Sequence, residues 1–163
     1  MTASGCGATV REYGHLLAHD PAYRDKAERI AALTKDLAEV IPADALPRGI
    51  AAGRVAFHSP CTLQHGQQIR GAVEACLARA GFELTAVRDA HLCCGSAGTY
   101  SLLEPAIAGE LRGRKLAALS EGQPEQIATA NIGCLTHLQG AAQLPVRHWI
   151  EVLDEALQRK MPS

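Results

Sequence analysis

Apolar residues in the first quarter of the chain recur at the spacing of a helix. Asp20 and Pro21 can open that helix, because Asp caps free backbone amides and Pro fits the first helical position. Pro42 would end it. The stripe between these points has spacings of three and four and consists of Ile30, Leu33, Leu37, Val40 and Ile41. The pattern therefore predicts one amphipathic helix before Pro42.

After residue 54 the pattern changes, and short apolar runs alternate with longer helical stretches. The runs typical of buried strands cover residues 55–57, 84–87, 127–130 and 145–148. The helical stripes between and after them cover residues 69–80, 101–119 and 150–157. Right-handed crossovers place helices on both sides of a parallel sheet. We therefore expect an α/β fold: a parallel sheet of about four strands with helices on both faces, preceded by a helical segment.

An internal echo and a linker suggest how the chain is divided. Residues 42–53 carry two prolines and two glycines, which is typical of a linker. The text from Thr2 to Cys6 resembles the text from Thr129 to Cys134, and each precedes a helical stretch. Such repetition predicts that residues 1–41 are the mostly helical tail of a first repeat. Residues 54–163 would then form a complete α/β domain, and the chain would be a fragment of a larger subunit.

Composition narrows the classes of partner. The chain has 163 residues, 47% of them hydrophobic and only 4% aromatic, with a formal net charge of -1. A disordered tail and a generic polyanion binder are excluded by these values, so nucleic acid is not an expected partner. No apolar run has the length of a membrane span, and the first residues do not have the pattern of a secretory signal. The expected location is therefore the cytoplasm.

Four of the six cysteines follow predicted strands. Cys61 lies after the first strand, Cys93 and Cys94 after the second, and Cys134 after the third. Loops that leave parallel strands converge at the carboxyl edge of the sheet. We therefore expect the four sulfur atoms to lie within roughly 10 Å of one another, where thiolates can bind Zn²⁺ or an iron-sulfur cluster. The alternative is that small thiols only fill this crowded edge.

The other candidate residues have simpler interpretations. Cys76 falls on a helical stripe and is expected in the core, and Cys6 is expected to be an unpaired thiol. Arg112, Arg114 and Lys115 could indicate an anionic partner, but a solvated helix face is favoured. Four histidines lie within a few residues of the clustered cysteines, and each alone is more typical of a surface or supporting residue: His58, His65, His91 and His137. Among them His137 is the strongest candidate ligand, because it forms a CxxH pair with Cys134.

The order of these elements resembles a known family. Ser59-Pro60-Cys61, Cys93-Cys94-Gly95 and Asn131-Ile132-Gly133-Cys134 resemble the cysteine-rich CCG domain of heterodisulfide reductases and their relatives. Within that group, the text around Cys6, Cys61 and Cys93 is similar to the carboxyl-terminal part of glycolate oxidase (glycolate dehydrogenase) iron-sulfur subunits. Nearly the whole chain is covered. Two features depart from the family: His137 stands where a final CxxC cysteine is usual, and the ferredoxin run CxxCxxCxxxC is absent from the sequence.

The resemblance implies an electron-transfer role. Cys61, Cys93, Cys94 and Cys134 would bind a [4Fe-4S] cluster or cycle as redox thiols, with His137 replacing a thiolate or standing outside the site. The chain would be part of a glycolate (2-hydroxy acid) dehydrogenase complex and would not be catalytic alone. Its partners would be a flavin-containing oxidoreductase subunit and the rest of the iron-sulfur subunit. These partners could bring it to the inner face of the membrane.

Two other functions remain open from the residues. Three or four thiolates, with or without an imidazole, could close a tetrahedral zinc site that only stabilises the fold. A metal-free domain could instead serve only for subunit docking. No Ser-His-Asp order, phosphate loop or HExxH motif supports a hydrolase or a nucleotide-dependent enzyme.

Overall fold

A computed structural model describes residues 1–160, with a four-stranded parallel sheet at its centre. The strands lie in the order β2-β1-β3-β4, and both neighbours of β1 as well as the β3–β4 pair are parallel. Their bounds are Arg54–His58 for β1, Glu83–Leu84 for β2, Gln126–Thr129 for β3 and Val146–His148 for β4. The predicted α/β fold is confirmed. The second strand is shorter than predicted, because only two of its residues pair with β1.

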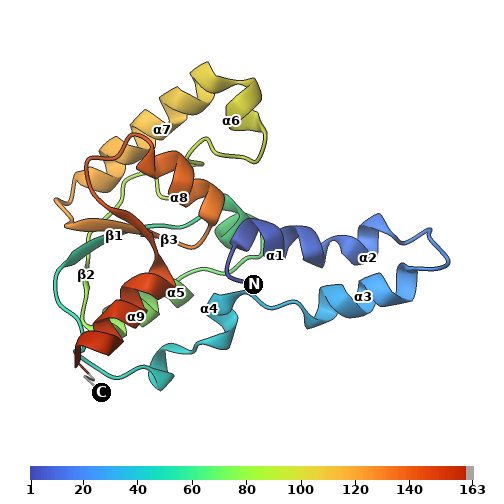
Figure 1. The fold of residues 1–163 in the computed structure, drawn as a ribbon, viewed down its shortest axis with the longest axis horizontal. Helices are drawn as coiled ribbons and strands as arrows, with labels where there is room; N and C mark the ends of the chain where they lie inside the picture. Colours follow the sequence, from blue (N-terminus) through green and yellow to red (C-terminus); the bar gives the residue numbers. More distant parts are fainter. Residues whose placement is uncertain (161–163) are drawn as a thin grey trace.

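Helices cover both faces of this sheet (Figure 1). On one face α5 (Ala72–Ala80) and α9 (Trp149–Lys160) pack against Val55 and Phe57 of β1. On the other face Ala56 packs with residues of α7 (Pro105–Ser120) and α8 (Ile132–Gln139). Successive side chains of a strand point to opposite faces, so the short apolar runs are buried on both sides. This alternation also decides which residues of β1 face α7 and α8.

The chain before the sheet is helical but is broken more often than the apolar spacing predicts. It forms α1 (Ser4–Arg11), α2 (Tyr13–Leu16), α3 (Arg24–Leu33), α4 (Leu37–Val40) and a 3₁₀ turn, η1 (Ala43–Ala45). The prediction of one helix ending at Pro42 is wrong, because Asp36 starts a new helix. Its carboxylate accepts a hydrogen bond from Ala38 N at 3.0 Å, and Glu39 accepts one from Asp36 N at 2.7 Å. This reciprocal pair is a capping box, which fixes a helix start.

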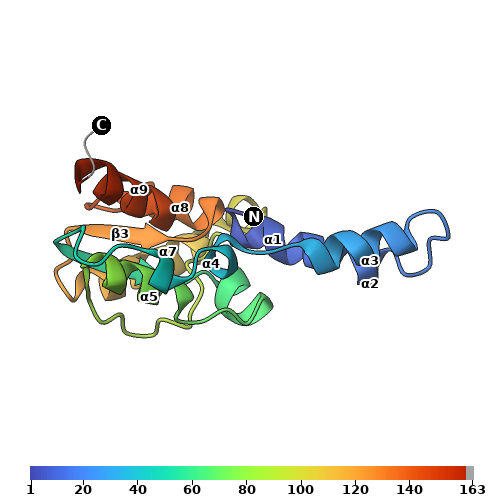
Figure 2. The ribbon, with the colours of Figure 1, turned by 90° about the horizontal axis from the view of Figure 1, so that it is seen from below.

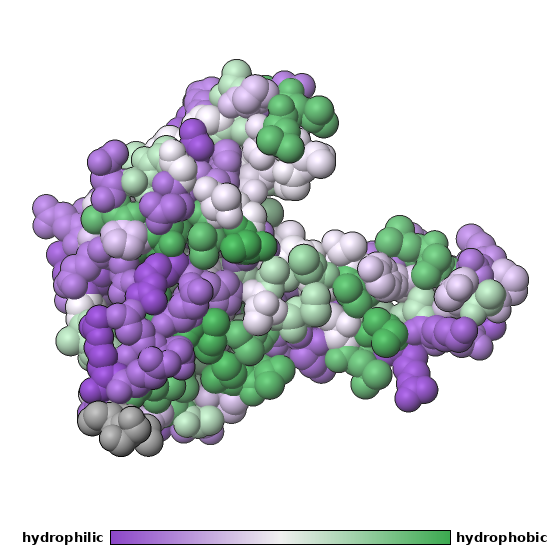
Figure 3. All heavy atoms as spheres, in the orientation of Figure 1, coloured by the Kyte–Doolittle hydropathy of each residue, from purple (hydrophilic) through white to green (hydrophobic). Residues whose placement is uncertain are grey.

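The α2–α3 pair projects from the α/β body as an arm (Figures 1 and 2). Two residues of the predicted stripe, Ile30 and Leu33, are 48% and 65% exposed on this arm. Figure 3 shows hydrophobic side chains at its surface. The stripe is helical as predicted, but only its last part reaches the core, where Leu37 and Ile41 pack beside the buried Ala38.

The predicted helix over residues 101–119 is also divided in two. The short α6 (Tyr100–Leu103) ends at Glu104, whose backbone has φ −124° and ψ 59°. The next residue, Pro105, disfavours helical geometry in the residue before it, so α7 begins afresh at Pro105. Among the described residues, neither of these helices nor any other is both long and apolar enough to cross a membrane.

The two echoing sequence segments lie in contact. Ser4 N donates to the carbonyl of Ala130 at 3.1 Å, and Gly5 N donates to the Asn131 side chain at 3.1 Å. Each segment leads from extended backbone into a helix, α1 or α8, and Cys6 and Cys134 each occupy the third position of that helix. The division of the chain into a first-repeat tail, a linker at 42–53 and a complete domain stays a prediction.

Candidate metal centre at the carboxyl edge of the sheet

The candidate cysteines lie beyond the carboxyl ends of the first three strands along the chain. Cys61 follows β1 and begins a single π-helical turn, η2 (Thr62–Gly66). Cys93 and Cys94 lie in the loop between β2 and α6. Cys134 lies in the first turn of α8, directly after β3. The parallel topology therefore brings segments far apart in sequence to one edge of the sheet.

The four thiols form a continuous row. Cys61 lies next to Cys93, Cys93 next to Cys94, and Cys94 next to Cys134, close enough for each thiol to shift the pKa of its neighbour. All six cysteines of the chain lie within the described residues and are free thiols. The structure thus assembles Cys61, Cys93, Cys94 and Cys134 at one site, and their role as ligands stays a prediction.

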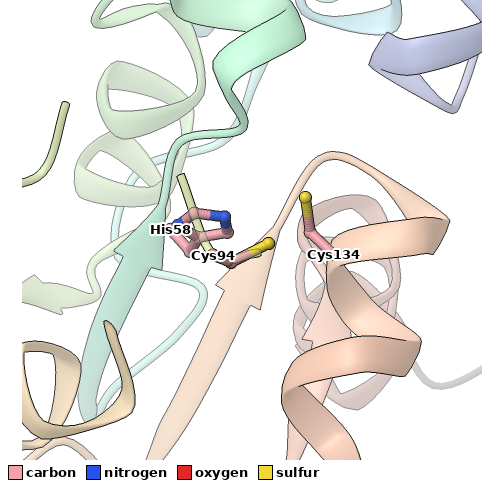
Figure 4. Close-up of side chains that lie close together, drawn as sticks. All are labelled: His58, Cys94 and Cys134. Carbon is pink, nitrogen blue, oxygen red and sulfur yellow. The ribbon is translucent and has the colours of Figure 1, made fainter. Parts of the chain in front are cut away.

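An imidazole joins this row, and it belongs to His58. The ligand atoms of His58, Cys94 and Cys134 all lie within 4.8 Å of one another, and the three residues are buried (Figure 4). His58 is the last residue of β1 and lies two residues after Ala56, so both face α7 and α8. The alternation of side chains along β1 indicates that His58 points to the same face as Ala56, whereas the spacing of the cysteines does not single out His58.

His137, the imidazole that the CxxH spacing favours, lies in a different environment. Its Nε2 atom is 3.3 Å from the backbone oxygen of Ala108 in α7. His137 is one turn further along α8 than Cys134 and is not part of the close group formed by His58, Cys94 and Cys134. His65 bonds to the backbone oxygen of the exposed His91 at 3.0 Å, so these two residues link neighbouring loops.

Polar side chains connect the loops of the site. The Gln64 side chain donates to the carbonyl of Ser59 at 2.8 Å and to that of Ala90 at 3.2 Å. It therefore ties the loop after β1 to the loop that carries Cys93. The Asn131 amide donates to Cys134 Sγ at 3.5 Å, while its oxygen accepts from Gly5 N. Asn131 thus couples the start of α1 to the thiol row.

Gly95 lets the cysteine loop pack closely against α7. Its φ is +93°, and a Cβ atom there would lie 2.6 Å from the backbone oxygen of Ala108. An L side chain would meet both a disfavoured backbone conformation and a backbone clash. The same residue donates its N–H to Cys93 Sγ at 3.3 Å. Gly95 therefore fixes the position of the adjacent cysteine pair.

The four thiols differ in their tendency to ionise. Hydrogen bonding to Cys61 and then to Cys94 holds the pKa of Cys93 far below its usual value. The pKa of Cys134 is lowered to about 5, first by hydrogen bonding to Cys94 and then by His58 and Asn131, while burial opposes them. The pKa values of Cys61 and Cys94 are raised, first by hydrogen bonding to Cys93 and Cys134 respectively, and then by the burial and negative charge around them. Closely spaced thiols cannot all ionise, so protonated and ionised sulfurs alternate.

This alternation predicts proton release when a metal binds. At pH 7 the raised pKa values keep Cys61 and Cys94 protonated, and a metal that uses both as thiolates must displace about two protons. Affinity should therefore rise with pH. Titration calorimetry with Zn²⁺ in buffers of different ionisation enthalpy measures the number of protons released per metal ion bound. Cys76→Ser should leave it unchanged, and zinc binding without proton release would contradict the ionisation pattern.

The donor set fits a soft or borderline metal. Thiolates and imidazole are the ligands that zinc and iron-sulfur centres use in proteins. The Nε2 atom of His58 is buried and has no hydrogen-bond partner among the described residues. Buried polar atoms are normally satisfied, and this unpartnered nitrogen belongs to the imidazole that lies beside Cys94 and Cys134, so the residues fit a metal.

Three other residues from the sequence have clear locations. Cys76 lies on α5 and is 1% exposed in the core, as expected, and its thiol donates to the carbonyl of Ile41 at 3.4 Å. Cys6 is an exposed free thiol on α1. Lys115 is only 3% exposed, so its interpretation as part of a solvated helix face is wrong. Position 115 lies on the side of α7 that faces the cysteine loop, where its Nζ donates to the backbone oxygen of Asp89 at 2.7 Å.

Comparison with known protein families gives a match over the same region. A profile described as "Cysteine-rich domain", CCG, matches residues 55–139. This range begins in β1 and ends with α8, so it contains all four cysteines of the thiol row as well as His58.

Related sequences extend the similarity over almost the whole chain. The chain is 52% identical over 162 residues to the "Glycolate oxidase iron-sulfur subunit" of Escherichia coli strain K12, covering 98% of this chain and 40% of that protein. It is 31% identical to "Lactate utilization protein A" of Geobacillus kaustophilus, covering 94% of this chain and 69% of that protein. The "Uncharacterized protein YkgE" of Escherichia coli is 30% identical, with 93% and 67% covered. The chain therefore spans less than half of the first relative and about two thirds of the others.

Proposed function

We propose, from the premise that this chain belongs to the cysteine-rich CCG domain family, that it is an iron-sulfur electron-transfer part of a 2-hydroxy acid oxidase-like complex. The observation that carries the proposal is the row of four thiols with a buried imidazole at the carboxyl edge of the sheet. The names of the relatives, an iron-sulfur subunit of glycolate oxidase and a lactate utilization protein, support the substrate class.

Cys61, Cys93, Cys94 and Cys134 would hold the cluster, with His58 as a further ligand or a hydrogen-bond partner of the thiolates. When bound, an iron-sulfur cluster of the proposed [4Fe-4S] type accepts and releases single electrons. The chain's own residues provide the binding atoms and shield them from water, since His58, Cys94 and Cys134 are each less than 5% exposed. Cys61 and Cys93 are partly exposed and form the side of the row nearer to solvent.

The electron source in this proposal is a flavin-containing subunit that oxidises glycolate or a related 2-hydroxy acid. The rest of the iron-sulfur subunit would be a second partner, because the first relative is more than twice as long as the matched region. Catalysis of the acid's oxidation would belong to the flavin subunit. A cytoplasmic location stays a prediction, which fractionation of cells expressing the complex would test.

Anaerobic reconstitution identifies the bound group. The 163-residue chain is incubated with iron and sulfide, desalted, and analysed for iron, sulfide and zinc together with its absorption spectrum. Bound iron with equimolar sulfide and broad absorption near roughly 400 nm support the proposal. Protein that retains no iron or sulfide after reconstitution would refute it.

A structural zinc site is the second candidate, favoured by the close group of His58, Cys94 and Cys134. Three protein ligands within one small volume, joined by a fourth thiolate, satisfy the tetrahedral preference of Zn²⁺. A colourless protein with one zinc, purified without added metal and unable to take up iron and sulfide, would favour this function.

Substitution of His58 and of His137 tests which of the two imidazoles contributes to metal binding. His58→Ala should lower metal affinity at least about tenfold, because it removes a buried nitrogen beside the thiolates. His137→Ala should leave affinity nearly unchanged, because the Nε2 atom of His137 already contacts the backbone of α7. Competition with a chelator of known affinity measures both. Loss of metal in the His137 variant alone would reverse the assignment.

A further inference from the structure

Lys115 is a buried cation without a carboxylate partner. Its side chain lies on α7, and the residue is 3% exposed. Among residues 1–160, no carboxylate oxygen lies within ion-pair distance of its Nζ atom, and its one hydrogen bond goes to the backbone oxygen of Asp89 at 2.7 Å. A buried ammonium is costly unless a negative charge balances it. An anion near Lys115 would therefore stabilise its charged form.

The cysteine row is the negative group that Lys115 faces. Lys115 and Cys93 line the same cavity of about 370 Å³, which lies between α7 and the cysteine loop. Negative charge on Cys94, Asp89 or Cys93 favours the ammonium form of Lys115, and Cys94 has the largest effect of the three once a metal holds it as a thiolate. Burial opposes them and lowers the pKa of Lys115.

The other cations beside this cavity have their own carboxylates. Arg88 is paired with Glu121 at 2.7 Å, and Arg114 is paired with Glu110. Both arginine side chains are mostly exposed, so solvent also screens their charge. Lys115 alone combines burial, proximity to the sulfurs and an unbalanced charge.

We infer that Lys115 is the counter-charge of the metal centre and raises its reduction potential. This inference rests on the proposed iron-sulfur function. Addition of an electron makes a thiolate-bound cluster more negative, and a nearby buried positive charge stabilises the reduced state more than the oxidised one. Lys115 acts through the electrostatic field at the sulfurs and binds neither substrate nor metal.

The test uses Lys115→Gln in the reconstituted 163-residue chain. Glutamine keeps an N–H donor for the Asp89 carbonyl but removes the charge. The ratio of reduced to oxidised cluster at a fixed ambient potential should fall about tenfold, which corresponds to about 59 mV for a one-electron couple. Potentials are read by redox titration followed by electron paramagnetic resonance, with iron and sulfide measured in each sample.

Two variants control for charge and for structure. Lys115→Arg keeps the positive charge and should restore most of the potential. Lys160→Gln removes a lysine that also donates to a backbone carbonyl, that of Gly49 at 2.9 Å, but that is exposed at the end of α9. Its potential should equal that of the unchanged chain, because solvent screens the lost charge.

Each outcome decides between the two proposals. Full iron and sulfide with an unchanged potential in Lys115→Gln would overturn the counter-charge and leave the proposed function intact. Absence of iron and sulfide in the unchanged chain would overturn both. If Lys115→Gln cannot hold the cluster, retention in Lys115→Arg supports the role of charge, and loss in Lys115→Arg as well shows that the lysine only shapes the loop and refutes it.

Discussion

Cys93→Ser should abolish metal binding while the chain remains folded. Cys93 lies inside the thiol row, between Cys61 and Cys94, and both neighbours lower its pKa. A serine hydroxyl does not ionise near neutral pH and is a poor ligand for zinc or an iron-sulfur cluster. Metal affinity should fall by more than about 100-fold, beyond the 10- to 100-fold loss typical of supporting residues. Metal content after desalting, with circular dichroism as the check of folding, measures the effect.

Cys76→Ser is the matched control for this substitution. Cys76 is as buried as Cys94, but it lies on α5, in the core cluster that also contains residues of α9, rather than in the thiol row. Serine at this position places a hydroxyl in an apolar environment and should lower the free energy of unfolding by about 1–3 kcal/mol. Metal content should not change. Equal metal loss in both variants would contradict the assignment of the row.

Gly95→Ala should disturb both stability and metal binding. The added methyl group would lie 2.6 Å from the Ala108 carbonyl and 3.0 Å from Leu111 Cβ, at a φ of +93°. The Ala108 oxygen is backbone and Leu111 Cβ is fixed to the backbone of α7, so both contacts can relax only if the cysteine loop moves away from α7. We expect a loss of about 2–4 kcal/mol in the free energy of unfolding from backbone strain and overpacking combined. Metal affinity should fall with it, because the displaced loop carries Cys93 and Cys94.

Gly98→Ala separates the backbone effect from the steric one. Gly98 also has a positive φ, +61°, but a Cβ there would meet no atom within 4 Å. Its cost should be only that of the left-handed conformation, about 1 kcal/mol, with metal binding retained. Chemical denaturation of the two variants gives the comparison. A Gly98→Ala variant as damaged as Gly95→Ala would show that contact with α7 is not the reason for the glycine.

The position of the thiol row could be predicted from the sequence because it depends on topology. Strands followed by helices specify a parallel sheet, and the carboxyl edge of such a sheet gathers the loops that hold Cys61, Cys93 and Cys134. No side-chain geometry is needed for that step. The order of elements along the chain is sufficient.

Spacing alone does not show which imidazole lies beside the sulfurs. CxxH places His137 one turn after Cys134, but which face of α8 meets the sulfurs depends on the packing of α7 against α8. His58 reaches the site because β1 alternates its side chains, and this becomes informative only when the face that Ala56 occupies is known. The burial of Lys115 is a similar case, since the basic run on α7 gives no sign of which cation faces inward.

The helix breaks arise from local capping and proline effects, which the apolar spacing does not report. The stripe from Ile30 to Ile41 continues across Asp36, but the capping box of Asp36 and Glu39 starts a second helix there. At Glu104 the following proline has the same effect. The residue types indicate both breaks: Asp36 and Glu39 form a capping box, and Pro105 disfavours helical geometry at Glu104.

The central claim is that the sulfurs of the thiol row bind one iron-sulfur centre together. X-ray absorption at the iron edge of the reconstituted chain tests it most directly, because it reports the atoms around the metal. We expect iron surrounded mainly by sulfur with a second shell of iron neighbours, and loss of both shells in Cys93→Ser. Iron bound only by oxygen and nitrogen, without iron neighbours, would contradict it.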